Sequence, residues 1–516
     1  MNRTVRLAVL LALLLAVGAW AVLQHRPPQA ASGIPLTEDG YATFIAKAKE
    51  AEEIDDEMQR CLHYPDPPGT HWHPETTAAY CGRRNLSTLS QADIGKLIDE
   101  GKVAELEKTF QSYLDNQQHD TRHLGMLDVA FFNAKFNVAS DRARSLIQSW
   151  QQQAPDSAFA VAASGMQYLA AAEIARGDDY AQRLTREQIA GMHKYAALAR
   201  QDLDRAAQLQ PAMTPAYYNM IIVGSLIGDE DYMADAAQRG LAADPTNFSI
   251  RANQMDRASP RWGGSTRAQA RLAEQAMALA AQAPLLRLIP AQIAADPAEC
   301  NCLPNPVARL LPAVDQGAVM SDLRLLANVA FNNGANRLAV VLYSEALRFN
   351  PVDADSLRWR AKMLAPLGDS PWALQGIERT AKRHPDNPDA TLALGRAYRD
   401  VGKTAQAEAA FIALLQRVPE HPKGMAMLGD MYSHESQQPD KAMAIADKLI
   451  ASNPENPDGY TIRACVQMHR QAPGAYETIQ YYLDHFGSRA DQEQPIRKMR
   501  EYLAQHPKPD QPAPSR

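Results

Sequence analysis

The stretch LGRAYRDVGKTAQAEAAFIALLQRVP, residues 394–419, decides the fold of this chain. Its small and large apolar residues recur at the spacing of packed α-helices. The proline that ends it belongs to a series, because Pro351, Pro385 and Pro419 stand 34 residues apart and Pro454 follows after 35. A period of this length is typical of a helix-turn-helix repeat.

The same residue pattern precedes the other prolines of the series. It comprises Leu326-Ala327, Ala339, Tyr343 and Ala346 before Pro351, and Leu428-Gly429, Tyr432, Ala442, Ala446 and Leu449 before Pro454. The copy before Pro385 is weaker, because Arg360-Ala361 replaces the Leu-Gly pair. Small residues let two helices approach closely, and larger ones fill the seam between them. One helix pair cannot bury that seam alone, so neighbouring units must stack.

On these residues the chain resembles the tetratricopeptide repeat family over residues 320–490. The resemblance implies an all-α, right-handed solenoid of helical hairpins that binds other proteins along the first helix of each unit. The family's groove positions, carried over residue by residue, fall on Arg324, Asn328, Arg358, Lys362, Arg396, Arg399 and Lys423. The carboxylate clamp of some members is not matched, because Trp359, Asp389 and Ala393 occupy its positions.

The predicted groove is basic, although the chain has a formal net charge of −6. Because arginine pairs well with carboxylates, we expect the partner to be another protein that offers an acidic segment. The alternative is that these residues are ordinary solvated charges on helix surfaces.

Composition and motifs limit the other functions. The 516 residues are 46% hydrophobic and 22% charged, as in a globular protein, and they contain few strand patterns. The sequence has neither a basic stripe with interleaved aromatic residues nor a nucleic-acid-binding motif, so we expect no nucleic-acid partner. It also has no Gly-x-Ser-x-Gly, His-Glu-x-x-His, P-loop or Rossmann motif. We therefore predict a scaffold without catalytic residues or a cofactor, and keep an enzyme as the third alternative.

The N-terminus has the features of a targeting segment. Arg3 and Arg6 precede the apolar run Leu7 to Leu23, which Gln24 and the residues after it end. The run is intermediate between a cleaved signal peptide and a spanning helix, and both interpretations stay open. Either predicts that the rest of the chain is exported to the periplasmic side of a bacterial inner membrane, where it would be soluble after cleavage or anchored to the membrane through this segment only.

Composition shifts divide the chain into six parts. They are the targeting segment and linker (1–36), a charged helix and cysteine loop (37–92), a helical domain with repeat-like pairs (93–300), a linker (301–319), the repeat array (320–490), and a terminal helix with a disordered tail (491–516). The charged helix is predicted from Glu38 to Arg60, and its run of acidic residues is predicted to be a solvated face.

Cys61 and Cys81 bound a proline-rich loop. In an oxidising compartment this spacing predicts a disulfide. The alternative is a zinc or copper site in which His63, His71 and His73 join the two thiols, or another small-ligand site in this loop. Two further cysteines, Cys300 and Cys302, are predicted in the linking loop, and Cys465 is predicted to be a buried, unreactive thiol in a degenerate fifth repeat.

The middle of the chain resembles a second family, the bacterial domain of unknown function numbered 4034. The residues that carry the likeness are YLAAAEIARGDDY, from Tyr168 to Tyr180, and SPRWGGS, from Ser259 to Ser265. The resemblance implies an exported or envelope-associated helical module with no assigned activity. Locally, Gly263-Gly264 predicts a turn and Ser265 a helix N-cap. Pro211 and Pro245 are 34 residues apart, and an extra helical stretch is predicted near Gly177 to Gly191.

Overall fold

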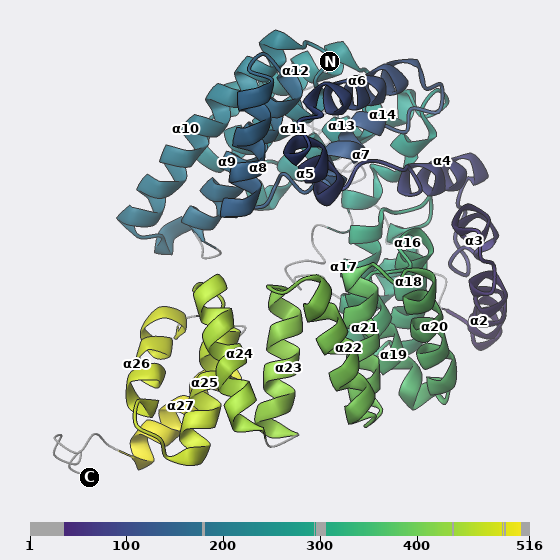
Figure 1. The fold of residues 1–516 in the computed structure, drawn as a ribbon. Helices are drawn as coiled ribbons and strands as arrows, with labels where there is room; N and C mark the ends of the chain where they lie inside the picture. The colour runs from purple at the N-terminus through teal and green to yellow at the C-terminus, as the bar shows by residue number, and fades with distance from the viewer. Residues whose placement is uncertain are drawn as a thin grey trace, which may run out of the picture. The chain divides into compact units, whose positions relative to one another are not determined.

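A computed structural model describes residues 36–506 except 178–180, 294, 296–305, 436–437, 488 and 490–491. All regular elements of these residues are helices (Figure 1). The chain divides into two compact units between Phe349 and Asn350. The division falls inside the predicted array 320–490, after its first hairpin. The predicted targeting segment, the Cys300 and Cys302 loop and the tail from residue 507 lie outside the described residues.

The first unit contains a series of helices joined by short turns. Its α-helices are α2 Glu38–Glu52, α3 Glu57–His63, α4 Pro74–Arg84, α5 Gln91–Asp99, α6 Val103–His119, α7 Met126–Asn133, α8 Asp141–Gln153, α9 Ala158–Arg176, α10 Arg186–Leu209, α11 Thr214–Ile227, α12 Glu230–Ala243, α13 Phe248–Arg257, α14 Thr266–Ala278, α16 Val307–Ala313, α17 Met320–Asn332 and α18 Asn336–Phe349. Three short 3₁₀ turns occur at Ala181–Arg183, Pro260–Trp262 and Pro284–Leu288.

Helices α9 and α10 form the most extensive hairpin of the first unit. A Cβ atom at Gly165 of α9 would lie 2.6 Å from Cγ of Leu203 on α10, so glycine is needed where the helices approach. Helix α10 has 24 residues, and only its first turns, from Arg186 to Gly191, fall in the stretch near Gly177 to Gly191 where extra helix is predicted. Helix α9 is the one described helix long and apolar enough to cross a membrane, and 67% of its apolar window is buried in this unit.

The second unit is an array of hairpins followed by one terminal helix. Its α-helices are α19 Ala354–Leu364, α20 Ser370–Arg383, α21 Pro388–Asp400, α22 Thr404–Arg417, α23 Pro422–His434, α24 Pro439–Ser452, α25 Pro457–Arg470, α26 Ala475–Phe486 and α27 Glu493–Gln505, with a 3₁₀ turn at Ala365–Leu367. Counting α17, the first helices start at residues 320, 354, 388, 422 and 457, which confirms the predicted period.

The seam between the two helices of a repeat explains its small residues. A Cβ atom at Gly395 of α21 would lie 2.5 Å from the ring of Phe411 on α22, and Phe411 is fully buried. Any larger residue at position 395 would have to displace the buried Phe411 ring, because the interior is close-packed. The Leu-Gly pair of the sequence pattern therefore marks the closest approach of the two helices.

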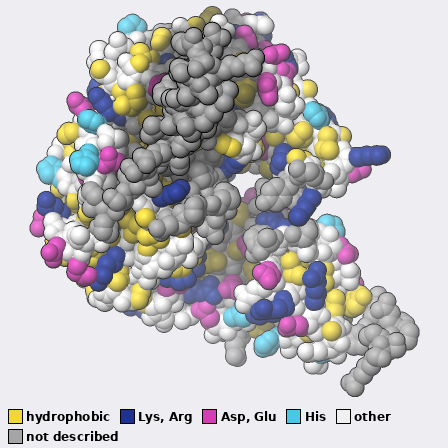
Figure 2. Space-filling view, turned by 180° about the vertical axis from the view of Figure 1, so that it is seen from behind, with side chains coloured by type: hydrophobic (Ala, Val, Ile, Leu, Met, Phe, Trp, Pro, Cys, Tyr) yellow, Lys and Arg dark blue, Asp and Glu magenta, His cyan; other side chains and the backbone are white. Residues whose placement is uncertain are grey.

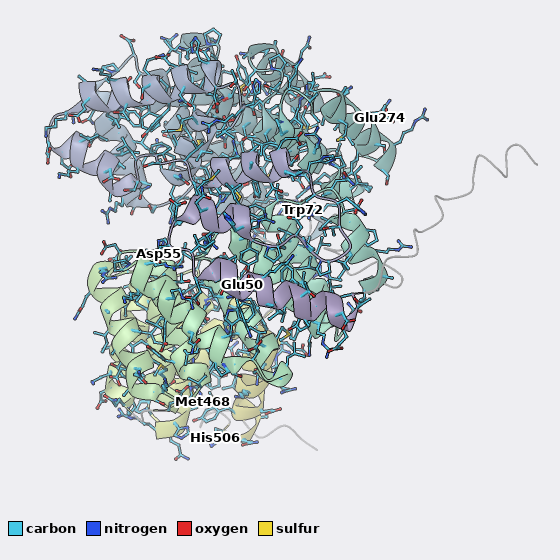
Figure 3. The ribbon with its side chains drawn as sticks, turned by 90° about the vertical axis from the view of Figure 1, so that its right-hand side faces the viewer. Glu50, Asp55, Trp72, Glu274, Met468 and His506 are labelled. Atoms are coloured by element: carbon cyan, nitrogen blue, oxygen red, sulfur yellow. A yellow bond between two sulfur atoms is a disulfide. The ribbon has the colours of Figure 1, made fainter. Side chains whose placement is uncertain are left out.

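The N-terminal region differs in detail from the prediction. The charged helix is broken after Glu52, because the Asp56 side chain accepts a hydrogen bond from the Gln59 backbone and starts α3 as a new helix. Glu50 and Asp55 are exposed as predicted (Figure 3). Glu52 is buried and accepts a hydrogen bond from the Tyr64 hydroxyl.

Two loops predicted from prolines and glycines also differ in part. The predicted linker 301–319 contains helix α16, which accommodates Pro312 near its end. Cys81 lies in helix α4, which begins at Pro74, and not at the end of an irregular loop. The turn at Gly263 and the N-cap at Ser265 are as predicted, because the Ser265 hydroxyl accepts a hydrogen bond from the Ala268 backbone.

Candidate functional site

The first helices of consecutive repeats in the second unit, α19, α21, α23 and α25, lie next to one another. We call the surface that they form the first-helix face. Five of the predicted groove residues are on three of its helices: Arg358 and Lys362 on α19, Arg396 and Arg399 on α21, and Lys423 on α23. Three of these five residues form ion pairs from one first helix to another.

Asp355 of α19 joins three helices of this face. Its carboxylate accepts a hydrogen bond from Arg396 at 3.0 Å and lies 3.5 Å from the Lys423 ammonium group. Arg396 is only 7% exposed, whereas the Lys423 side chain is 59% exposed. Arg396 therefore serves the packing of the array, and Lys423 remains accessible.

Arg399 forms the second ion-pair cluster of the first-helix face. Its guanidinium donates to Asp430 and, at 2.6 Å, to Glu435, both reached from α21 across to α23. Asp430 also lies 3.1 Å from His434, which contacts the Cys465 thiol at 3.2 Å. Most of the positive charge of Arg399 is therefore balanced within the array.

Arg358 and Lys362 flank one aromatic ring. The Arg358 guanidinium lies 5.3 Å and the Lys362 ammonium 4.9 Å from the centre of the Trp359 ring, within the range of cation–π contact. Among the predicted groove cations of the second unit, Lys362 and Lys423 are exposed, and Arg358 is half-buried without an ion pair to an acid in the described part of the array.

Arg324 and Asn328 belong to α17, in the first unit. The Asn328 amide oxygen accepts a hydrogen bond from the Tyr343 hydroxyl at 2.5 Å, which joins the two helices of that hairpin. Sequence spacing placed these two residues in one groove with the other five, but they belong to the other compact unit.

The surface charge is mixed rather than uniformly basic. On the face drawn in Figure 2, lysine and arginine side chains are interspersed with aspartate and glutamate side chains. The acidic partners Asp355 and Asp430 come from α19 and α23, which also carry predicted groove cations, and Glu435 directly follows α23. The predicted groove positions could not show that these acids balance the charge of the cations, because the acids stand at positions that the prediction did not include.

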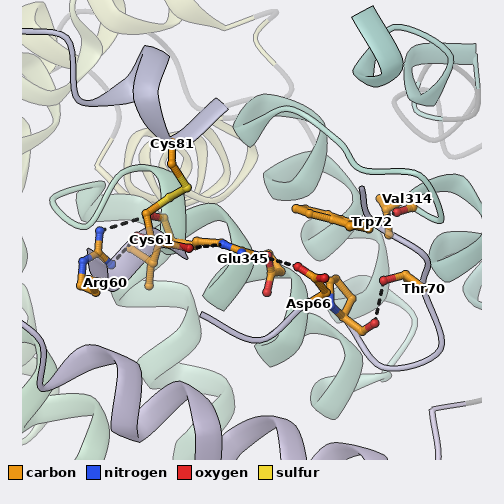
Figure 4. Close-up of polar contacts among 11 residues, drawn as sticks. Arg60, Cys61, Asp66, Thr70, Trp72, Cys81, Val314 and Glu345 are labelled. Carbon is orange, nitrogen blue, oxygen red and sulfur yellow. Dashed lines mark hydrogen bonds and ion pairs between the residues drawn. A yellow bond between two sulfur atoms is a disulfide. The ribbon is translucent and has the colours of Figure 1, made fainter. Parts of the chain in front are cut away.

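The cysteine loop packs on the last helix of the first unit. Cys61 and Cys81 are joined by a disulfide with an S–S distance of 2.04 Å and a Cα–Cα distance of 5.9 Å, which ties α3 to α4 (Figure 4). Arg60 donates to the backbone oxygens of Leu347 and Arg348 at the end of α18. Arg348 in turn donates to the backbone oxygen of Cys61 at 2.8 Å.

Aromatic side chains fix the same loop. Trp72, labelled in Figures 3 and 4, donates its indole N–H to the backbone oxygen of Val314 at 2.6 Å and stacks on Phe349. His71 pairs with Asp315 at 2.7 Å. The His63 ring contacts the backbone oxygen of Gln59 within its own helix.

These contacts explain the unusual composition of the loop without a bound ligand. No group of three or more His, Cys, Asp or Glu side chains within the described part of the chain is placed to hold a metal ion. The alternative of a metal site in this loop therefore has no support from the arrangement of its residues.

Cys465 lies on α25 and is half-buried. Burial, together with the negative charge of Asp430, raises the pKa of its thiol. A thiol with a raised pKa is mostly protonated and is a poor nucleophile.

Comparison with known protein families finds a match within the second unit. The profile of the family described as "Tetratricopeptide repeat" matches residues 392–457, from α21 to the start of α25. This part of the second unit is therefore similar to tetratricopeptide repeats. A search of curated proteins finds no match to the chain. The likeness of the middle region to the domain numbered 4034 stays a prediction.

Several solved tetratricopeptide repeat structures are similar to parts of the chain. A protein from Thermus thermophilus is 20% identical, with 36% of this chain and 99% of that chain covered and a TM-score of 0.30. One from Parabacteroides merdae is 15% identical, with 55% and 99% covered and a TM-score of 0.33. YrrB, described as having an unusual peptide-binding site, is 13% identical, with 51% and 97% covered and a TM-score of 0.22. These similarities assign no role to any residue of this chain.

Proposed function

We propose that this protein is a non-catalytic scaffold that binds another protein along the first-helix face, at the bacterial cell envelope. The observation that carries the proposal is the direct pairing of residues on α19, α21 and α23, which makes one continuous surface from successive repeats. Helical repeats commonly use such extended surfaces to bind polypeptide segments.

The partner segment is proposed to be acidic. Lys423, Arg358 and Lys362 offer exposed or half-exposed cations, and the Trp359 ring lies beside two of them. Carboxylates of a partner would form charge-assisted hydrogen bonds with these groups. Arg396 and Arg399 are proposed to hold neighbouring repeats together and not to bind the partner, because acids of the array already pair with them.

The location at the envelope is proposed from the N-terminal sequence alone. Arg3 and Arg6 before a single apolar run favour export with the basic end inside. A reporter enzyme that works only in the periplasm should be active when fused after Arg516, and one that works only in the cytoplasm should be inactive there. Activity of a cytoplasm-dependent reporter at that position would refute the proposed location.

A charge-reversal experiment tests the binding face. The variants Arg358→Glu and Lys423→Glu should each weaken binding by roughly tenfold, about 1.4 kcal/mol, because an acidic partner would then be repelled. Lys448→Glu is the matched control, since Lys448 is an exposed lysine on α24, a second helix. Envelope proteins recovered with each variant would be quantified by mass spectrometry, and thermal midpoints would be compared.

A partner that is recovered with wild type and Lys448→Glu, but lost with Arg358→Glu and Lys423→Glu, would support the proposal. Its recovery should also fall as salt is increased, because exposed charge pairs are screened. Equal recovery with all variants would refute the use of this face.

A further inference from the structure

A cavity of about 710 Å³ lies within the first unit. Helices α4, α7, α9, α11, α13 and α17 all contribute to its lining. This volume is in the range of pockets that bind small molecules. None of its lining residues belongs to the second unit, so the cavity is separate from the first-helix face.

Both sequence motifs of the middle region meet at this cavity. The motif from Tyr168 to Tyr180 contributes Glu173, and the motif from Ser259 to Ser265 contributes Ser259 and Arg261. The local role of the second motif, a turn followed by a helix N-cap, does not require it to lie near the first motif. The two motifs nevertheless line the same cavity.

Two groups of opposite charge in the cavity wall are incompletely satisfied. Oδ2 of Asp322 is buried and has no hydrogen-bond partner among the described residues, and the same is true of Nε of Arg257. The other carboxylate oxygen of Asp322 accepts a long hydrogen bond from the Ser321 hydroxyl, at 3.4 Å. Arg257 lies 3.4 Å from Asp256 and 4.7 Å from the Trp262 ring centre.

Asp322 and Arg257 both line the cavity, and no ion pair joins them in the described part of the chain. Asp256 forms an ion pair with Arg257, and its negative charge also acts on Asp322. Burial, with this charge, raises the pKa of Asp322 to about 7. A buried charge without a partner is costly, and a ligand carrying the opposite charge would remove that cost.

Two buried amides add oriented acceptors to the wall. Asn219 and Asn253 are 4% and 5% exposed. Their amide nitrogens donate to the backbone oxygens of Pro215 and Tyr218, at 2.7 and 2.8 Å. Since only the nitrogen can donate to a carbonyl, the other atom of each amide is an oxygen, and it has no donor within the described chain.

We propose that this cavity binds a small zwitterion, a free amino acid or a short peptide with free ends. Its ammonium group would contact Asp322 and its carboxylate would contact Arg257. Its remaining N–H groups would donate to the amide oxygens of Asn219 and Asn253. A ligand with only one charge would leave unsatisfied either Oδ2 of Asp322 or Nε of Arg257, which makes no hydrogen bond to a described residue beside its ion pair with Asp256.

The test uses zwitterions whose charges are separated by increasing distances. Alanine, dialanine and trialanine would be titrated into the purified exported protein by calorimetry, together with their N-acetylated and C-amidated forms. We expect at least one unblocked compound to bind, and either blocking group to weaken it about tenfold or more, about 1.4 kcal/mol. The chain length that binds best identifies the free amino acid or the peptide as the preferred ligand.

Two variants locate the binding site. Asp322→Asn and Arg257→Gln should each reduce affinity for the best compound about tenfold. Asp99→Asn and Arg142→Gln, which change exposed residues on α5 and α8, should leave affinity unchanged. The blocked compounds on wild-type protein keep the test decisive if a variant fails to fold.

Three results would each refute the proposal. The first is that no unblocked compound binds at millimolar concentration. The second is that blocked and unblocked forms bind equally well. The third is that Asp322→Asn and Arg257→Gln bind like their controls.

Discussion

Replacement of Glu345 by glutamine should make the first unit more stable at neutral and alkaline pH. Glu345 lies on α18 and is fully buried, and burial raises the pKa of its carboxyl to about 8. Arg348, 3.3 Å away, opposes this shift, but Arg348 also pairs with Asp66 at 2.7 Å (Figure 4). Glutamine keeps the shape of the side chain and cannot ionise.

The sign of the pH dependence follows from the raised pKa. Below the unfolded pKa of about 4.5, the carboxyl is protonated in both states and its contribution is fully present. Between pH 4.5 and about 8 the unfolded state loses the proton while the folded state keeps it, so stability falls as pH rises. At about 1.4 kcal/mol per pH unit, the loss approaches about 4 kcal/mol at pH 8, as an upper bound.

Hydrogen exchange of peptides from α18 measures this effect locally. At each pH between 5 and 8, wild type and Glu345→Gln would be compared under identical conditions, so that intrinsic exchange rates cancel. The protection gained by the variant should grow with pH, and Glu105→Gln, at an exposed position of α6, should show no gain. Parallel behaviour of wild type and Glu345→Gln over this range would refute the reasoning.

Three further predictions concern stability. Cys61→Ser should cost about 3 kcal/mol because the bridged residues are 20 apart in sequence, and non-reducing peptide mapping should find the linked pair; free thiols at both positions would contradict this prediction. Phe411→Ala should cost about 3 to 5 kcal/mol in denaturant unfolding, whereas Ile412→Ala, at a 37% exposed position, should cost under about 1 kcal/mol; equal costs would refute the seam assignment. Arg396→Glu should cost about 2 kcal/mol or more, because it places a carboxylate beside Asp355, and a change within error would show that the pair is not structural.

The sequence by itself determined the repeat architecture. The proline series and the residues Gly395, Ala407 and Phe411 specify a helical hairpin because each depends on local spacing and on a seam between adjacent helices. These are short-range constraints, and a single sequence displays them directly. The same reasoning predicted the N-cap at Ser265, which depends only on its own turn.

Only the tertiary structure decided the roles of the charged residues. Arg396 and Lys423 look equivalent in sequence, yet one is buried against Asp355 and the other is exposed, because accessibility depends on neighbouring helices. Asp322 and Arg257 are 65 positions apart in the chain and carry no local pattern that connects them. They line one cavity because α13 and α17 converge there, and long-range packing of this kind leaves no periodic signal in the sequence.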